Sequence, residues 1–251
     1  MPEMLSTAKL KYLKSLQHKK YRQKYSEFLI EGDKVVAEAL HSDWEVTSLV
    51  YTAGHEPPAL THTKAPEVVL ASAQQMQQLS SLHTPPGMLA VVKIQAPTAL
   101  ELTGWTLALD GIRDPGNMGT LIRTAAWMGF RQVICSEDTV DLYNPKTIQA
   151  TMGALFHLPV RYGNLDTLLQ EATPPIYAAD MSGTTIEKID IPEQGILVIG
   201  GESSGVREVV LQRATEVVSI PSSGKGESLN AAVAAGILMW EISRRTGAGG
   251  N

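Results

Sequence analysis

Hydrophobic and polar positions form two successive patterns along the chain. In the first, apolar positions recur at helical spacing over residues 6–25, and residues 28–40 combine a strand end with an amphipathic helix. Three short apolar runs typical of strands and one helix-like segment complete this part, at residues 46–52, 67–72, 88–94 and 73–82. This order predicts a small α/β domain over residues 1–97.

The second pattern begins at Trp105. It follows residues 95–104, which contain a proline and show no clear period and which we therefore interpret as a linker. Near-continuous apolar runs then alternate with helix-like stretches, at residues 106–112, 131–137, 175–180, 195–202 and 216–221. These runs predict a parallel sheet of five strands with helices on both faces, in a second domain over residues 105–246. Ligands of such sheets bind beyond the carboxyl ends of the strands.

The composition indicates a soluble, unexported protein. Of the 251 residues, 43% are hydrophobic, which is enough for ordinary globular cores. Cys135 is the only cysteine, so the chain can form no internal disulfide, and a reducing, cytoplasmic compartment is expected. The segment after Met1 is polar and rich in lysine, and no apolar run reaches the roughly 18 residues of a membrane helix, so no membrane partner is expected.

Positive charge is concentrated near the amino end, although the net charge is −5. Residues 9–24 contain six lysines, one arginine and His18, and no acidic residue. Such a run is either a solvated face or a binding surface for nucleic acid, because cations that neutralise phosphates release counterions. Under the second interpretation the candidate RNA-binding residues are Lys19, Lys20, Arg22 and Lys24.

Three loops of the second domain follow strand-like runs and carry polar side chains. In the first, a strand ends near Asp110 and a helix carries Arg123 toward the same end of the sheet; Asn117 in the turn could simply cap this helix. In the second, residues 198–206, glycines allow a close backbone approach around Glu202. In the third, a helix begins near Ser228, which could also be only a cap. Together the three loops can surround one ligand.

Several other kinds of site lack their signatures. The six histidines are scattered, without H-x-x-x-H spacing or partnering cysteines, so we expect no metal site. Neither glycine loop has the G-x-G-x-x-G pattern of a dinucleotide site, and neither has the P-loop pattern. The first absence argues against a nicotinamide-dependent oxidoreductase. No G-x-S-x-G surrounds Ser228, as a hydrolase nucleophile would require.

The three loops also carry motifs that resemble a known family. The order N-x-G-x-x-x-R from Asn117 to Arg123, I-G-G-E-x-x-G from Ile199 to Gly205, and I-P-x-x-G-x-x-x-S-L-N from Ile220 to Asn230 resembles the SpoU, or TrmH, branch of the SPOUT RNA methyltransferases. The resemblance covers about residues 105–245. Residues 19–40 are similar to the substrate-binding domain that precedes the catalytic domain in many members, which is like a ribosomal RNA-binding protein fold.

The resemblance implies a fold and a cofactor. The fold would be an α/β sheet whose carboxyl-terminal segment threads a deep trefoil knot, an exception to the rule that chains avoid knots. The cofactor would be S-adenosylmethionine, with Ile220 and Leu229 beside its adenine and backbone groups of the loops bonded to it. The implied cofactor-binding residues are Ile199, Gly200, Gly201, Ile220, Pro221, Gly224 and Leu229.

The reaction implied by the resemblance moves a methyl group to a ribose 2′-hydroxyl of RNA. Arg123 would position a phosphate and polarise the hydroxyl; as a guanidinium it donates protons rather than accepting them. Asn117, Ser228 and Asn230 would order the arginine and the ribose, and Glu202 would orient loop groups or contact the substrate. The RNA would be ribosomal, of the large subunit, before transfer RNA. A catalytically silent RNA-binding or ribosome assembly protein is the alternative from another class.

The last helix predicts a homodimer. Residues 231–242 carry more apolar side chains than packing on one sheet face needs, and relatives in the resembled family pair through this helix and the first helix of the domain. A two-fold dimer is the commonest arrangement of identical chains. Simple burial of these side chains in the core is the alternative.

Overall fold

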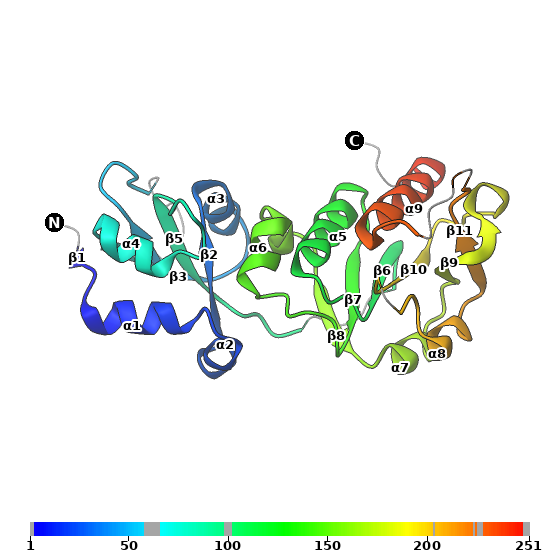
Figure 1. The fold of residues 1–251 in the computed structure, drawn as a ribbon, viewed down its shortest axis with the longest axis horizontal. Coiled ribbons are helices and arrows are strands. Elements are labelled where there is room, and N and C mark those ends of the chain that lie inside the picture. Colours follow the sequence, from blue (N-terminus) through cyan, green and yellow to red (C-terminus); the bar gives the residue numbers. More distant parts are fainter. Residues whose placement is uncertain are drawn as a thin grey trace. The chain divides into compact units, whose positions relative to one another are not determined.

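The computed structural model describes residues 3–57, 66–97, 102–202, 204–222, 224 and 228–247 (Figure 1). Two compact units make up the chain: Met1–Ala96 with Tyr143–Phe156, and Pro97–Leu142 with His157–Asn251. Part of the predicted linker, residues 98–101, and part of the third loop, residues 223 and 225–227, lie outside the described residues.

The first unit contains a mixed sheet, as predicted for an α/β domain. Its strand order is β1-β4-β3-β5-β2, with β3 and β2 antiparallel to β5 and both other pairs parallel. The strands are β1 (Glu3–Met4), β2 (Glu27–Glu31), β3 (Val46–Tyr51), β4 (Glu67–Leu70) and β5 (Met88–Lys93). The helices are α1 (Thr7–Ser15), α2 (Lys19–Tyr25), α3 (Asp33–His41), α4 (Ala73–Leu79), α6 (Pro145–Thr151) and the short η1 (Ala154–Phe156).

Both faces of this sheet are buried, because successive side chains of a strand point to opposite sides. Leu29 of β2 packs in a cluster with Leu13 of α1 and Met76 of α4. Its neighbours Phe28 and Ile30 pack in a second cluster that includes residues of α3, α6 and η1. The sheet therefore has a hydrophobic core on each side.

The segment Tyr143–Phe156 belongs to the first unit, although it lies inside the range predicted for the second domain. Its aromatic residues explain this: the ring of Tyr143 lies 4.6 Å from that of Phe28, and the ring of Phe156 lies 5.5 Å from that of Trp44. Ile148 is buried in the same cluster. The compact units therefore do not coincide with the ranges 1–97 and 105–246.

The second unit contains the predicted parallel sheet. Its strand order is β11-β9-β10-β6-β7-β8, and every pair of neighbours is parallel. The strands are β6 (Trp105–Asp110), β7 (Gln132–Ser136), β8 (Val160–Gly163), β9 (Ile176–Thr185), β10 (Gly195–Gly200) and β11 (Glu216–Ser219). All five predicted runs contain a strand. The edge strand β8 was not predicted, because it is only four residues long, is partly exposed throughout and includes Arg161.

Helices cover both faces of this sheet (Figure 1). On one face, α7 (Leu165–Gln170) and α8 (Glu208–Leu211) pack on a cluster that includes Ala108, Ile134 and Val198. On the other, α5 (Pro115–Trp127) lies beside α9 (Ala231–Thr246). A short helix, η2 (Ile186–Lys188), follows β9. None of the described helices is both long enough and apolar enough to cross a membrane.

Candidate active site

The three predicted loops meet at the carboxyl edge of the parallel sheet. β6 and β10 are neighbours in the sheet, and their last residues, Asp110 and Gly200, are paired. The first loop leads from Asp110 to α5, the second follows Gly200, and the third leads to the start of α9 at Asn230. Because the strands are parallel, all three connections leave the sheet at the same edge.

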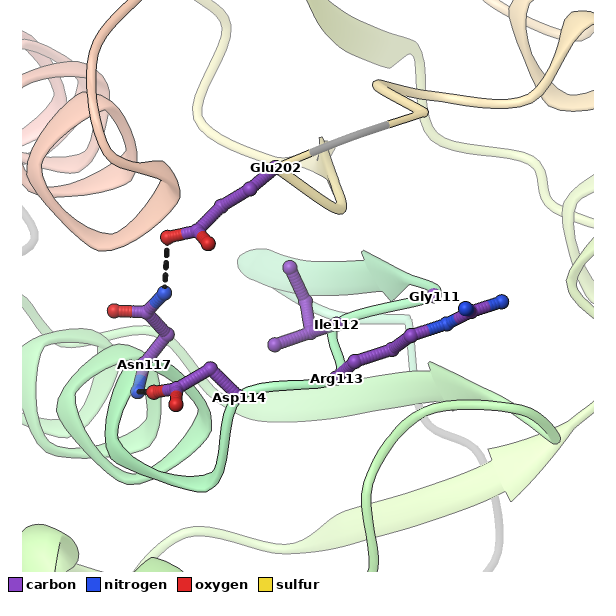
Figure 2. Close-up of a pocket in the computed structure, with 6 residues that line it drawn as sticks. All are labelled: Gly111, Ile112, Arg113, Asp114, Asn117 and Glu202. Carbon is purple, nitrogen blue, oxygen red and sulfur yellow. Dashed lines mark hydrogen bonds between the residues drawn. The ribbon is translucent and has the colours of Figure 1, made fainter.

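Three side chains from these loops form one hydrogen-bonded group. The amide nitrogen of Asn117 donates to Glu202 Oε1 over 2.6 Å, as Figure 2 shows. Asn230 Nδ2 donates to the same oxygen over 2.7 Å and to Asn117 Oδ1 over 3.2 Å. The structure thus brings Asn117, Glu202 and Asn230 together, whereas the catalytic roles predicted for them remain predictions.

Helix capping fixes the orientation of two of these residues. Asp114 caps α5 by accepting from the backbone N–H of Asn117 over 2.8 Å, so Asn117 itself is not the cap. Asn230, not Ser228, caps α9, because its Oδ1 accepts from the N–H groups of Ala232 and Val233 over 3.0 and 3.2 Å. The helix end requires the oxygen of Asn230, which leaves its amide nitrogen to point at Glu202.

A cavity of about 130 Å³ lies at this edge, lined by Gly111, Ile112, Arg113, Asp114, Asn117 and Glu202. Ile112 is almost fully buried and gives the cavity one apolar wall. Asn117 and Glu202 point toward one another, while the side chain of Arg113 extends away from them (Figure 2). The cavity thus combines an apolar surface with amide and carboxylate groups, as ligand sites do.

The glycines of the second loop allow it to lie directly on the sheet edge. A Cβ atom at Gly200 would lie 2.0 Å from the carbonyl carbon of Gly205, and one at Gly201 would lie 2.7 Å from the carbonyl oxygen of Gly111. Gly201 donates its N–H to the carbonyl of Asp110 over 3.0 Å. The close approach foreseen at these glycines is therefore to the protein's own backbone, and the N–H of Gly201 is not free for a cofactor.

An ion pair between a buried carboxylate and a partly exposed arginine, which sequence reasoning missed, holds the far end of this loop. The side chain of Asp110 is fully buried and accepts from Arg207 Nε over 2.7 Å and from the backbone N–H of Arg207 over 2.8 Å. The bond to Asp110 raises the pKa of the Arg207 guanidinium. The sequence did contain an indication of this pair, since the carboxylate of Asp110 ends the apolar run that begins at Leu107. A charge buried at the end of such a run needs a partner.

Positive charge also acts on the neighbouring carboxylate, Asp138. A hydrogen bond from Ser136 is the main cause that lowers the pKa of Asp138, and the nearby Arg207 and Arg113 lower it further. Arg207 Nη1 lies 3.9 Å from Asp138 Oδ1. Asp138 is therefore a stable anion beside the two arginines.

The other residues predicted to act in catalysis or cofactor binding lie outside the hydrogen-bonded group. Arg123 is exposed on α5, about 9 Å further along the helix axis than Asn117, and it makes no hydrogen bond or ion pair with the part of the chain that is described. Ile199 is buried in the core, which leaves its side chain unavailable to a ligand. Ile220 is half-buried, and the remaining predicted loop residues Pro221, Gly224, Ser228 and Leu229 are exposed.

Among the predicted RNA-binding residues, Arg22 requires a correction. Lys19, Lys20 and Lys24 are exposed on α2, but Arg22 is only 4% exposed. Its guanidinium donates to the carbonyls of Leu16 and Gln17 over 3.0 and 2.7 Å, just after α1. Arg22 therefore satisfies the carbonyls that follow a helix end and is not part of the surface.

Within the described residues, no group of three or more His, Cys, Asp or Glu side chains is arranged to hold a metal ion.

We expect Arg207→Ala to destabilise the protein by about 1.5–3 kcal/mol, because it leaves the buried Asp110 carboxylate without its charged donor. Arg213→Ala is the matched control. It removes a similar bond, from Nε to Asp166 over 2.7 Å, but the Asp166 carboxylate is about one third exposed whereas that of Asp110 is fully buried, so a loss of about 0.2–1 kcal/mol is expected. Urea denaturation followed by tryptophan fluorescence measures both. Equal losses would contradict the assignment of Asp110 as a buried anchor.

Two family models match this chain. One, described as the SpoU rRNA Methylase family, matches residues 104–240, and the other, described as the MRM3-like substrate binding domain, matches residues 7–90. The chain is 32% identical over 244 residues to the 23S rRNA (guanosine(2553)-2'-O)-methyltransferase RlmP of Bacillus subtilis (strain 168). That alignment covers 96% of this chain and 98% of the relative.

Two solved structures with AdoMet are similar over nearly the whole chain. The SpoU methyltransferase AviRb from Streptomyces viridochromogenes, in complex with the cofactor AdoMet, matches with a TM-score of 0.85 and 25% identity over 96% of this chain and 98% of that one. An AdoMet-bound rRNA methyltransferase from Sinorhizobium meliloti matches with a TM-score of 0.85 and 28% identity over 96% and 97% of the two chains.

Proposed function

Because the chain belongs to the SpoU rRNA methylase family, we propose that it transfers a methyl group from S-adenosylmethionine to a ribose 2′-hydroxyl of RNA. The observation that carries this proposal is the hydrogen-bonded group of Asn117, Glu202 and Asn230. It joins three loops at the sheet edge where parallel α/β folds bind ligands. The relative from Bacillus subtilis, which is named as a 23S rRNA methyltransferase, supports large-subunit ribosomal RNA as the substrate.

The residues of the second and third loops fit S-adenosylmethionine. Leu229 has a side chain that is 51% exposed directly before the cap of α9, and the half-buried Ile220 follows β11. Exposed apolar side chains next to hydrogen-bonding backbone suit an adenine ring. Gly200, Pro221 and Gly224 would complete the binding loop. When bound, the cofactor supplies an electrophilic methyl group on its sulfonium.

Arg123 would act on the RNA rather than as a base. A guanidinium has no proton-accepting atom and has five N–H donors in a planar fork that suits a phosphate. The side chain is exposed, and none of the described residues holds it in an ion pair. It is thus available to position a phosphate and to polarise the 2′-hydroxyl.

Glu202 would hold the loops in place. Its Oε1 already accepts two amide N–H bonds, from Asn117 and Asn230. These bonds fix the ends of α5 and α9 relative to each other. Ser228, exposed just before Asn230, would order the ribose. The knot implied by the family would keep the third loop in place and remains a prediction.

The exposed apolar surface of α9 and the end of α5 supports a homodimer. α9 exposes Val233 (51%), Ile237 (41%) and Trp240 (57%) at positions i, i+4 and i+7, which form one stripe on the helix. Trp127, at the end of the neighbouring α5, is 84% exposed. We therefore propose that this apolar stripe is covered by the same stripe of a second chain, in a two-fold arrangement.

Mapping of 2′-O-methylated nucleotides tests the proposed reaction and its substrate. In RNA from cells with and without the gene, one site in large-subunit ribosomal RNA is expected to lose its methyl group when the gene is deleted. If a methylated site is lost from transfer RNA instead, transfer RNA is the substrate. No lost site in either RNA, together with no transfer by the purified protein, would favour a catalytically silent RNA-binding protein.

Replacement of Arg123 separates its proposed role from cofactor binding. Arg123→Ala is expected to lower the rate of methyl transfer by at least about 100-fold, because alignment of the reacting groups is lost, and to change the affinity for S-adenosylmethionine by less than about twofold. Arg131→Ala is the matched control, since Arg131 is also exposed but precedes β7 at the opposite edge of the sheet. Full turnover by Arg123→Ala would refute the assigned role.

The dimer is tested with a pair of equally exposed apolar residues. Ile237→Asp on α9 is expected to convert the dimer to a monomer in analytical ultracentrifugation, because a carboxylate would be buried in the interface. Val209→Asp on α8, where Val209 is 43% exposed against 41% for Ile237, should leave the dimer intact. A monomeric parent protein at micromolar concentration would rule out the proposed interface.

A further inference from the structure

Aromatic rings form a connected series along the first unit's α2. The rings of Tyr21 and Tyr25 are nearly parallel, with an angle of 14° and 6.3 Å between their centres. His18, the residue before the helix, lies 6.5 Å from Tyr21. Because Tyr21 and Tyr25 are four residues apart, both rings lie on one side of the helix.

The rings are partly open to solvent. Tyr25 is 39% exposed, His18 is exposed and Tyr21 is half-buried. The hydrophobic clusters on the two faces of the sheet include neither Tyr21 nor Tyr25. The rings therefore form a surface ladder rather than part of the hydrophobic core.

Tyr12 supports the ladder through a contact with Tyr25. Its ring meets that of Tyr25 edge to face, with 5.2 Å between centres and an angle of 79°. The hydroxyl of Tyr12 donates to Glu27, which also accepts from Thr47 over 3.1 Å. Burial, followed by the bond to Glu27, raises the pKa of Tyr12. This support holds Tyr25 in place before any ligand binds, which lowers the entropy lost on binding.

Exposed lysines lie on the same helix as the ladder. Lys19, Lys20 and Lys24 are exposed on α2, and no acidic residue occurs between positions 9 and 24. The ammonium of Lys24 lies 5.1 Å from the centre of the Tyr25 ring. Such a combination of open rings and cations matches RNA, in which bases stack on aromatic side chains and phosphates bind lysines. Paired bases are stacked inside a helix, so only unpaired nucleotides can use it.

We propose that Tyr21 and Tyr25 are a stacking platform for unpaired bases of the RNA substrate, with Lys19, Lys20 and Lys24 bound to the flanking phosphates. The proposal rests on the proposed function, because it takes RNA as the substrate. A base on the Tyr25 ring would displace Lys24, whose long side chain then reaches a phosphate. The buried Arg22 takes no part.

The salt dependence of binding distinguishes the rings from the cations. The probe is a fluorescent single-stranded oligoribonucleotide of about 12 nucleotides, titrated with the full-length protein at several salt concentrations. The double variant Tyr21→Ala/Tyr25→Ala is expected to bind about tenfold more weakly at every salt concentration, with an unchanged slope of log K against log salt. Lys19→Ala/Lys20→Ala should weaken binding and also flatten that slope by about 0.7 for each phosphate that the protein no longer neutralises.

Matched controls keep this test independent of folding. Tyr21→Phe/Tyr25→Phe keeps the rings and should bind like the parent protein. Tyr25→Leu keeps apolar volume without a π face and should bind more weakly even if the alanine variant does not fold. Lys34→Ala removes an exposed lysine from α3, which packs in the cluster on the other face of the sheet, and should change neither affinity nor slope. A duplex of the same sequence should bind less tightly than the single strand.

The platform is overturned if the alanine and leucine variants both bind like the parent, if they change the salt slope instead of the affinity, or if the duplex binds equally well. Failure of the proposed function gives a different result, in which the parent protein transfers no methyl group from S-adenosylmethionine to any RNA. The affinity for S-adenosylmethionine, measured on the same variants, is expected to stay unchanged and shows that the second unit is intact.

Discussion

The arrangement of the candidate site depends on Asp110, the last residue of β6. Its carbonyl accepts from the N–H of Gly201, and its buried carboxylate accepts from the backbone and side chain of Arg207. One residue therefore anchors the second loop at both ends, and Glu202 lies between the anchors. Because a carboxylate is costly to bury unless it is paired and hydrogen-bonded, the loop and the strand end are stable only together. The planar guanidinium of Arg207 provides directional donors that a lysine would not.

Stability and orientation are supplied by different contacts at this edge. The hydrogen bonds among Asn117, Glu202 and Asn230 are exposed, so each contributes little to the free energy of folding. The helix caps fix the same residues more firmly, since Asp114 holds the N–H of Asn117 and Asn230 holds the start of α9. The side-chain oxygen of Asn230 must point at the start of the helix, and this orientation determines where its amide nitrogen points. The capping of α9 by Asn230 thereby also directs a hydrogen-bond donor toward Glu202.

Sequence reasoning identified the strands and loops of the second unit because buried parallel strands are continuous apolar runs with glycine-rich connections. It missed what depends on long-range packing. The strand β8 has no apolar run. The segment Tyr143–Phe156 joins the first unit through rings whose partners, Phe28 and Trp44, are more than 100 residues away in the sequence. Arg22 looked like its lysine neighbours, yet it satisfies the carbonyls after α1. Charge counted along a sequence cannot distinguish a surface cation from one that is buried against the end of a neighbouring helix.

The proposed chemistry explains why RNA contacts far from the reacting atoms matter. Arg123 has no proton-accepting atom, and one oxygen of Glu202 already accepts two amide N–H bonds, so the proposal assigns neither group the role of general base. In-line displacement at a methyl group then depends chiefly on alignment of the hydroxyl with the methyl donor. Alignment costs the entropy of a flexible nucleotide, and that cost must be offset by binding elsewhere on the same RNA. The proposed platform of rings and lysines on the first unit would provide such binding energy without touching the hydroxyl, and the proposal thereby gives the two units complementary parts of one reaction.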